Sequence, residues 1–411
     1  MPDFSAGWAR TTLDCCIAAV EAGTSVNSED RRRTYGEAAV LKTSAVSGGR
    51  FYPNRHKAVV AEDLPRVSCP VKGGTIILSR MNTKELVGES GYVREDDHEL
   101  FLPDRLWALT PRPDTDGRWL SQLLASPGMR DVLGSRATGT SGSMKNISQP
   151  VLLGTPVLKS PMVEQRRIAA VLDAWDDAAL AAEQLTALAD RKQAALLQYL
   201  FTNDGTTTGT LAEYFIERKE WGRSGLPVYS VTLEGGLTPR EQLDRRTESA
   251  LADDAHALVE RGDLAYNMMR MWQGALGIAD QPCLVSPAYV VMQPLPSVDI
   301  RFAAAWMKSP RGLDRLWAYS HGITEDRLRL YADDFLAIPV SFPPLDRQRA
   351  IGQAHETTAQ ATREARALAE TLRRQKRGLM QKLLTGEWRV PAIGNAFVPG
   401  GPAADRLEVA E

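Results

Sequence analysis

The chain has 411 residues, of which 43% are hydrophobic and 24% are charged, and its formal net charge is -2. This length and composition predict two or three globular domains with ordinary apolar cores. No apolar run approaches the roughly 18 residues that span a bilayer, and Asp3, Arg10 and Asp14 interrupt the N-terminal stretch, so we expect neither a membrane helix nor a secretory signal. The near-neutral charge argues mildly against nucleic-acid binding without excluding it, because binding depends on where the charges lie.

Residues 1–160 are expected to form a first domain that is mixed but rich in β-strands, because its short apolar runs are split by Gly and Pro. Within it, residues 74–80 read as a Gly-led turn that enters a short strand. Residues 138–147 are rich in Gly, Ser and Thr and are expected to form a loop.

A long helix is expected over residues 161–204, since no Pro or Gly follows Pro161 within it. A helix of about 40 residues is about 60 Å long at about 1.5 Å per residue.

Residues 205–343 are expected to form a second domain of similar size and kind. Its residues 228–236 weakly resemble residues 40–49, and its residues 262–268 resemble residues 74–80. A second long helix is expected over residues 344–390, and the Pro-, Gly- and Ala-rich residues 391–411 are expected to form an irregular tail.

The two helical segments are copies of one another. When the chain is aligned with itself so that Pro161 falls on Pro344, residues 161–202 match residues 344–385 without a gap, and 12 positions are identical. Chance would give roughly three identities over that span at ordinary residue frequencies. The chain is therefore expected to be a tandem of domain plus helix, in which the helices have kept a shared role while the domains have diverged.

Apolar residues recur along each copy in steps of three and four, which favours a coiled-coil seam. The first copy has net charge -2 and the second +5, so we expect the two copies to pair with each other. The seam does not fix their direction, and two copies separated by a whole domain could pack antiparallel. Two ordinary amphipathic helices on separate domain surfaces are the alternative. The expected seam contains Ile168, Val171, Trp175, Ala178, Ala182, Leu185 and Ala189, and in the second copy Ile351, Ala354, Thr358, Ala361, Ala365, Leu368 and Leu372.

Signatures of catalysis and of metal binding are absent from the sequence. It contains no Walker A motif, no nucleophile elbow and no Asp/Asn-Pro-Pro-Tyr/Phe motif of the kind expected in an adenine-N6 methyltransferase. The four cysteines include no Cys-x-x-Cys pair and the five histidines are scattered, which predicts no metal site and favours a reduced, cytoplasmic compartment. We expect a non-catalytic protein that binds no cofactor itself.

The helix motifs resemble one protein family. Residues 161–169 read PMVEQRRIA, which is similar to the Pro-Leu-x-Glu-Gln-x-x-Ile-Ala opening of the paired helices in specificity (S) subunits of type I restriction–modification systems. Residues 196–202 (LLQYLFT) and 376–390 (KRGLMQKLLTGEWRV) resemble the ends of those helices. Two departures are Asn203-Asp204 in place of the usual Gly and Asp346-Arg347-Gln348 in place of Glu-Gln.

The resemblance implies an α+β fold, with two β-rich target-recognition domains that each read one half of a split site in double-stranded DNA. It implies that the helices form an antiparallel spacer and dock two methyltransferase (modification) subunits, joined by motor/nuclease (restriction) subunits. S-adenosylmethionine, ATP and Mg are then expected on those partners. Spacer or docking roles are assigned to Gln165, Arg166, Ile168, Leu185, Leu196, Gln348, Arg349, Ile351, Leu368 and Leu379.

Readout of DNA needs polar and cationic side chains on short loops. The expected readers in the first domain are Arg80, Asn82, Lys84, Ser141, Ser143, Lys145 and Asn146, and in the second Asn267, Arg270, Gln273, His321 and Thr324. The alternative for the Ser/Thr-rich loops is a plain flexible connection. Three alternatives to a type I S subunit remain open: a coiled-coil recognition adaptor of another defence system, an orphan specificity protein, and an enzyme whose site the motifs do not reveal.

Overall fold

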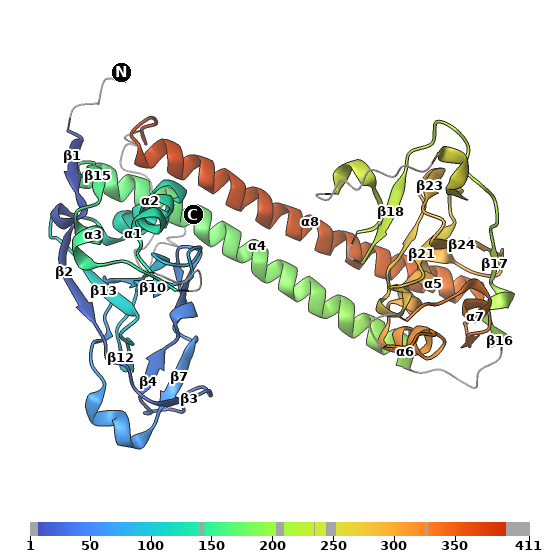
Figure 1. The fold of residues 1–411 in the computed structure, drawn as a ribbon, viewed down its shortest axis with the longest axis horizontal. Coiled ribbons are helices and arrows are strands. Elements are labelled where there is room, and N and C mark those ends of the chain that lie inside the picture. The colour runs from blue at the N-terminus through green and yellow to red at the C-terminus, as the bar shows by residue number, and fades with distance from the viewer. Residues whose placement is uncertain are drawn as a thin grey trace, which may run out of the picture. The chain divides into compact units, whose positions relative to one another are not determined.

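The computed structural model describes residues 7–139, 144–202, 209–233, 235–243, 252–324 and 328–391. It divides into two compact units: unit 1 is Met1–Ala181 with Ala369–Glu411, and unit 2 is Ala182–Leu368. Each unit combines a β-rich domain, called domain 1 in unit 1 and domain 2 in unit 2, with part of each long helix. These helices are α4 (Met162–Thr202) and α8 (Leu345–Leu384) (Figure 1).

The central sheet of domain 1 separates two apolar cores. Its strands follow the order β11-β9-β13-β2 and all pair antiparallel. Along β9, Ile76 and Leu78 belong to one core and Ile77 to the other. Successive strand residues point to opposite faces, so this apolar run is buried on both sides. The strands are β2 (Ile17–Ala22), β9 (Ile76–Ser79), β11 (Ser90–Tyr92) and β13 (Leu106–Pro111).

A second sheet of domain 1 has the strand order β3-β7-β4-β12-β8, in which β4 and β12 pair in parallel. Three short antiparallel pairs, β1-β15, β5-β6 and β10-β14, complete the strands described in unit 1. Their bounds are β1 (Ala9–Thr12), β3 (Ser28–Glu29), β4 (Ala39–Leu41), β5 (Val46–Ser47), β6 (Arg50–Phe51), β7 (His56–Val59), β8 (Pro70–Val71), β10 (Met81–Asn82), β12 (Asp97–Phe101), β14 (Lys145–Asn146) and β15 (Pro156–Lys159).

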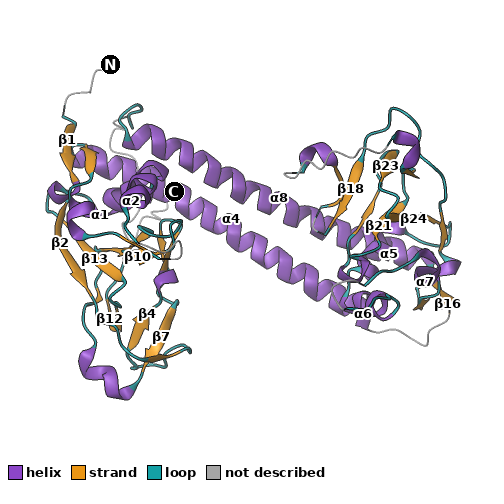
Figure 2. Ribbon diagram, viewed as in Figure 1, coloured by secondary structure: helices purple, strands orange, loops and turns teal. Residues whose placement is uncertain are grey.

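Helices cover one face of the central sheet in unit 1. Figure 2 shows α1 and α2 (purple) beside the strands (orange). Trp119 and Leu120 of α1 share a core with Ile168 and Leu172 of α4 and with Met380 of α8. The start of α4 and the end of α8 are therefore anchored here by burial of apolar side chains. The short helices are α1 (Gly117–Ala125), α2 (Pro127–Arg136) and α3 (Gln149–Leu153).

Domain 2 repeats the central sheet of domain 1. Its sheet has the order β17-β24-β21-β22, and β24 pairs antiparallel with β21 and β17 as β13 does with β9 and β2. Its elements are β16 (Gly209–Thr210), β17 (Phe215–Glu217), β18 (Tyr229–Thr232), β19 (Gly236–Pro239), β20 (Ala257–Val259), β21 (Leu264–Asn267), β22 (Leu276–Ile278), β23 (Cys283–Val285), β24 (Tyr289–Pro294), α5 (Ile300–Met307), α6 (Pro310–Ala318), α7 (Ala332–Leu336) and β25 (Pro339–Val340).

Within each unit, α4 and α8 run antiparallel. In unit 1, Lys376 Nζ lies 2.7 Å from the Asp176 carboxylate, and further back along α4 Glu164 meets Arg389 at 2.8 Å. In unit 2, Gln193 lies 3.2 Å from His355 and Asp190 lies 3.5 Å from Arg366. The predicted fold class, mixed domains with two packed long helices, is confirmed.

The expected seam is wrong in detail. Ala178 and Ala361 are exposed, and Leu185 and Leu368 are 56% and 49% exposed. Ile168, Ala182 and Ile351 of the expected seam are buried. Elsewhere the buried positions lie one residue later than expected, at Leu172, Ala179, Ala359, Thr362 and Ala369. Alanines occur on several faces of both helices, and the buried face also carries Thr362 and the half-buried Asp176, so apolar spacing alone selected the wrong stripe.

Candidate nucleic-acid interface

In domain 1, the strand that follows β9 and the end of the Ser/Thr-rich loop lie side by side. β10 pairs with β14, so that Asn82 is opposite Lys145 and Met81 is opposite Asn146. The backbone oxygen of Arg80 also accepts the amide of Ile147 at 2.9 Å. The structure therefore brings together two groups of expected readers that lie far apart in the sequence.

These side chains differ in how far their polar groups are already hydrogen-bonded within the domain. Arg80 donates its Nε to the Asp104 backbone oxygen at 2.7 Å, and its guanidinium lies over the Trp107 ring. Asn82 uses both ends of its amide locally, on Ser79 Oγ and on the amide of Thr83. The polar groups of both residues are therefore used mainly to hold the strand end in place.

Two lysines remain at this end of domain 1. Lys84 is exposed, and Lys145 Nζ donates to the Gly139 backbone oxygen at 3.0 Å, in a solvent-exposed bond. Asn146 Oδ1 is buried and has no hydrogen-bond partner among the described residues. Ser141 and Ser143 lie outside the described residues.

Domain 2 has an equivalent arrangement. The backbone oxygen of Met268, just after β21, accepts the amide of Leu330 at 3.0 Å, and His321 and Arg329 close the loop between them through two backbone bonds of 2.8 Å. In domain 1 Thr138 and Asn146 close the corresponding loop. The two loops have equal length, and they occupy equivalent positions in the sequence repeat that relates the helices.

The other expected readers of domain 2 lie on this strand end or in this loop. Asn267 Oδ1 accepts the Met269 amide at 3.0 Å, and Arg270 and Gln273 are on the turn that follows. Arg270 is exposed and Gln273 is exposed as well. His321 Nε2 lies 3.2 Å from Asp334 with a 65% exposed side chain, and Thr324 is exposed.

The expected spacer and docking residues fall into two groups. Ile168, Ile351, Gln165 and Gln348 are buried, and Leu196 and Leu379 are half-buried. Arg166 and Arg349 are exposed, as are Leu185 and Leu368. The buried residues hold the helices to their surroundings, whereas the exposed residues are accessible to another molecule.

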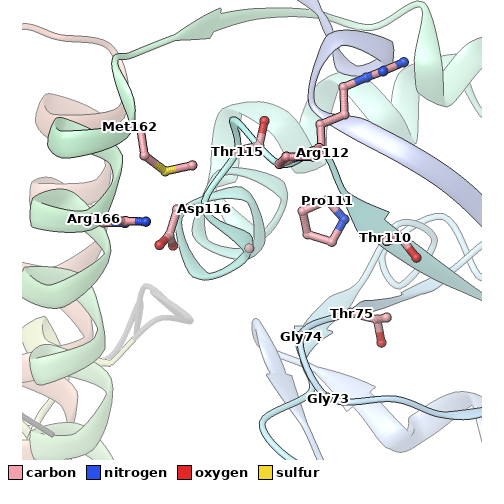
Figure 3. Close-up of a pocket in the computed structure, with 12 residues that line it drawn as sticks. Gly73, Gly74, Thr75, Thr110, Pro111, Arg112, Thr115, Asp116, Met162 and Arg166 are labelled. Atoms are coloured by element: carbon pink, nitrogen blue, oxygen red, sulfur yellow. The ribbon is translucent and has the colours of Figure 1, made fainter. Parts of the chain in front are cut away.

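A pocket of about 400 Å³ lies beside the first turns of α4 in unit 1. Figure 3 shows Met162 and Arg166 on α4 facing Asp116 at the start of α1, with Gly73, Gly74 and Thr75 on the far side. The lining offers two cations (Arg112 and Arg166), one carboxylate (Asp116) and three threonine hydroxyls. The Asp116 carboxylate already accepts two backbone amides at the start of α1, so the lining does not pair a nucleophile with a free base.

A polar network joins α1, α4 and α8 in unit 1, and sequence reasoning missed it. Gln122 Nε2 donates to Asp173 Oδ1 at 3.0 Å and to Asp176 Oδ2 at 2.8 Å, and Asp176 also accepts from Lys376. Burial raises the pKa of the Asp173 carboxyl above its ordinary value, and the Gln122 hydrogen bond and the nearby Arg118 only partly oppose this shift. Polar residues on the helix face were the only signal of this network in the sequence.

Two further searches of the described ranges gave negative results. No group of three or more His, Cys, Asp or Glu side chains is placed to hold a metal ion there. No helix in those ranges combines the length and the apolar character needed to cross a membrane.

No protein-family model matches the chain. The chain is 26% identical over 169 residues to the type I restriction enzyme EcoEI specificity subunit of Escherichia coli, a match that covers 41% of this chain. The match spans only 28% of that relative's length.

Two solved structures resemble most of the chain in fold. The type I restriction–modification S subunit from M. genitalium matches with a TM-score of 0.62 at 14% identity, covering 93% of this chain and 98% of that one. The chain resembles type I specificity subunits in sequence and in fold. A second chain, from a structure on complex assembly and conformational transition of the type I system, has a TM-score of 0.52 at 16% identity, covering 94% of this chain and 100% of its own.

The resemblance predicted from the helix motifs is therefore confirmed. Type I specificity subunits and this chain share the arrangement of two mixed domains on long helices, although their sequences have diverged far.

Proposed function

We propose that this chain is the non-catalytic, cytoplasmic DNA-specificity subunit of a type I restriction–modification system. Domain 1 reads one half of a bipartite site in double-stranded DNA and domain 2 reads the other. The observation that carries the proposal is the repeated pairing of a strand end with a polar loop, Arg80 to Ile147 in domain 1 and Met268 to Leu330 in domain 2. Two copies of one reading surface suit a site that has two halves.

The exposed faces of α4 and α8 dock two methyltransferase subunits, and motor/nuclease subunits join that core. Exposed residues at identical repeat positions support this role: Arg166 with Arg349, and Leu185 with Leu368. Two equivalent surfaces on one chain suit two copies of the same partner. S-adenosylmethionine, ATP and Mg bind to those partners, which supply the chemistry.

The test is to co-express the chain with the methyltransferase encoded beside it and to map methylated adenines across the host genome. The expected result is methylation within two short motifs separated by a fixed number of unread base pairs. Methylation of a single contiguous motif would overturn two-domain reading. An absence of methylation with a stable DNA complex would favour an adaptor of another defence system or an orphan protein.

A variant separates the two halves. Arg270→Ala, in domain 2 alone, is expected to weaken discrimination between matched and mismatched bases in one half-motif and to leave discrimination in the other half-motif unchanged. Equal losses for both half-motifs would contradict the assignment of one domain to each half.

A further inference from the structure

Each long helix begins with one fully buried glutamine. Gln165 of α4 and Gln348 of α8 are 0% and 2% exposed. A buried amide is costly unless both its oxygen and its nitrogen are hydrogen-bonded. Both ends of both glutamines are satisfied, and the partners are backbone groups of the neighbouring domain.

In unit 1, Gln165 connects α4 to the start of α1. Its Oε1 accepts the backbone amide of Asp116 at 2.8 Å, and its Nε2 donates to the backbone oxygen of Ser160 at 2.6 Å. The Asp116 carboxylate accepts the amides of Arg118 and Trp119, each at 3.0 Å, and so caps α1. One side chain thereby fixes the helix to the residue that sets the direction of α1.

In unit 2, Gln348 makes the same connection. Its Oε1 accepts the amide of Asp299 at 3.0 Å, and its Nε2 donates to the Pro343 oxygen at 2.8 Å. Asp299 caps α5 through the amides of Arg301 and Phe302. The glutamine and the capping aspartate are 49 residues apart in both units.

We call the contact between each glutamine and its capping aspartate a junction: Gln165 with Asp116 in unit 1, and Gln348 with Asp299 in unit 2. The residues around the two junctions differ, whereas the glutamine and the aspartate are the same. Trp119 in α1 corresponds to Phe302 in α5, and Gln122 corresponds to Ala305, at equivalent positions of the repeat. The apolar contacts thus differ, yet the glutamine, the capping aspartate and the hydrogen bond between them recur in both units. Among the described residues, Gln348 makes one more bond than Gln165, since its Nε2 also donates to the Ser297 backbone oxygen at 3.3 Å. Hydrogen bonds are directional, whereas apolar contacts allow neighbouring elements to slide.

The pocket of about 400 Å³ lies beside the unit 1 junction, against Asp116, Met162 and Arg166 (Figure 3). Further along α1, Trp119 and Leu120 are fully buried in the core that α1 shares with α4. The hydrogen bond from the Asp116 amide to Gln165 therefore acts at the end of α1 that borders the pocket, and apolar packing holds the rest of the helix.

We propose that Gln165 and Gln348 are positioning residues, each of which fixes the angle at which a recognition domain is held on its own helix and so governs how accurately that domain reads its half-site. The proposal rests on the proposed function and adds a residue-level cause of half-site accuracy. Neither glutamine contacts DNA, since both are buried.

The test uses Gln165→Met and Gln348→Met, which keep the side-chain length and remove the hydrogen bonds of the amide. Each is assembled with the methyltransferase subunits and assayed on DNA with a matched site and with single mismatches in either half. We expect the ratio of matched to mismatched methylation to fall about tenfold for one half-site only, and for opposite half-sites in the two variants. Each variant is thus the matched control for the other.

A second readout is hydrogen exchange of the free chain. The amide of Asp116 is expected to lose protection in Gln165→Met alone, and that of Asp299 in Gln348→Met alone. Equal loss of methylation on all sites, or unchanged discrimination in both variants with an active wild-type complex, would overturn the positioning role. Failure of the wild-type complex to methylate any two-part site would instead overturn the proposed function.

Discussion

Lys145 and Lys84 are the two expected readers of domain 1 that offer a charge to DNA, and Lys145 is the one that lies on β14, at the end of the Ser/Thr-rich loop. Arg80 and Asn82 are held by local hydrogen bonds, whereas the bond of the Lys145 ammonium within the described residues is a solvent-exposed one to the Gly139 carbonyl. A phosphate would replace that bond at little cost, because a charged donor bonds more strongly to an anion.

Lys145→Ala is therefore expected to weaken DNA binding a few-fold, equally on matched and unmatched sequences. It should also lower the slope of log affinity against log salt by about 1. Fluorescence anisotropy at several salt concentrations measures both quantities. The matched control is Lys72→Ala, an exposed lysine of the same domain, and a slope that falls equally in both variants would count against a phosphate contact.

Asp173 gives a pH-dependent prediction. Burial raises the pKa of its carboxyl, so ionised Asp173 destabilises the fold at neutral pH. Asp173→Asn keeps an oxygen that can accept from Gln122 and removes the charge. We expect a higher Tm at pH 7, with a gain that shrinks as pH falls through the raised pKa towards the unfolded value, because the wild-type carboxyl then becomes protonated as well. Calorimetry across the acidic to neutral range checks this, and a gain that does not change with pH would contradict it.

At the scale of elements, the sequence predicted the long helices, their pairing and the β-rich character of both domains. Those features depend on repeated or periodic residues, which a sequence displays directly. It did not predict which stripe of each helix is buried, because Asp176 and Lys376 lie in that stripe as a polar pair that satisfies itself. It also missed Gln122, Asp116 and Asp299, whose roles depend on residues distant in the sequence.

The Asp176–Lys376 pair yields a prediction about the helix pair in unit 1. Its side chains are 18% and 12% exposed, so Lys376→Met leaves a largely buried carboxylate that keeps only weaker support from Gln122 and Arg50. We expect unit 1 to lose about 2–3 kcal/mol, near the lower end of the cost of breaking a buried ion pair. Adding Asp176→Leu should recover most of that loss, since no charge then remains buried. Urea unfolding of the wild type, Lys376→Met, Asp176→Leu and the double variant completes a double-mutant cycle. If the losses in unfolding free energy of the two single variants add up to that of the double variant, the two side chains are not coupled.

At the scale of the whole molecule, the duplication gives α4 and α8 matched surface positions. Where a repeat position holds the same exposed residue in both helices, those two residues form a matched pair. Arg166 belongs to unit 1 and Arg349 to unit 2, and both are exposed in the first turns of their helices. If these positions dock methyltransferase subunits, charge reversal at one of them should weaken one docking site at least about tenfold and spare the other, because an interface arginine often carries much of the binding energy. Native mass spectrometry is expected to show two methyltransferases per chain for the wild type, one for Arg166→Glu or Arg349→Glu, and none for the double variant.

Arg377→Glu is the control, because this exposed arginine of α8 corresponds to Ala194 and has no counterpart in the other copy. Two methyltransferases retained on both single variants would place the docking surface elsewhere, with exposed Leu185 and Leu368 the next positions to change.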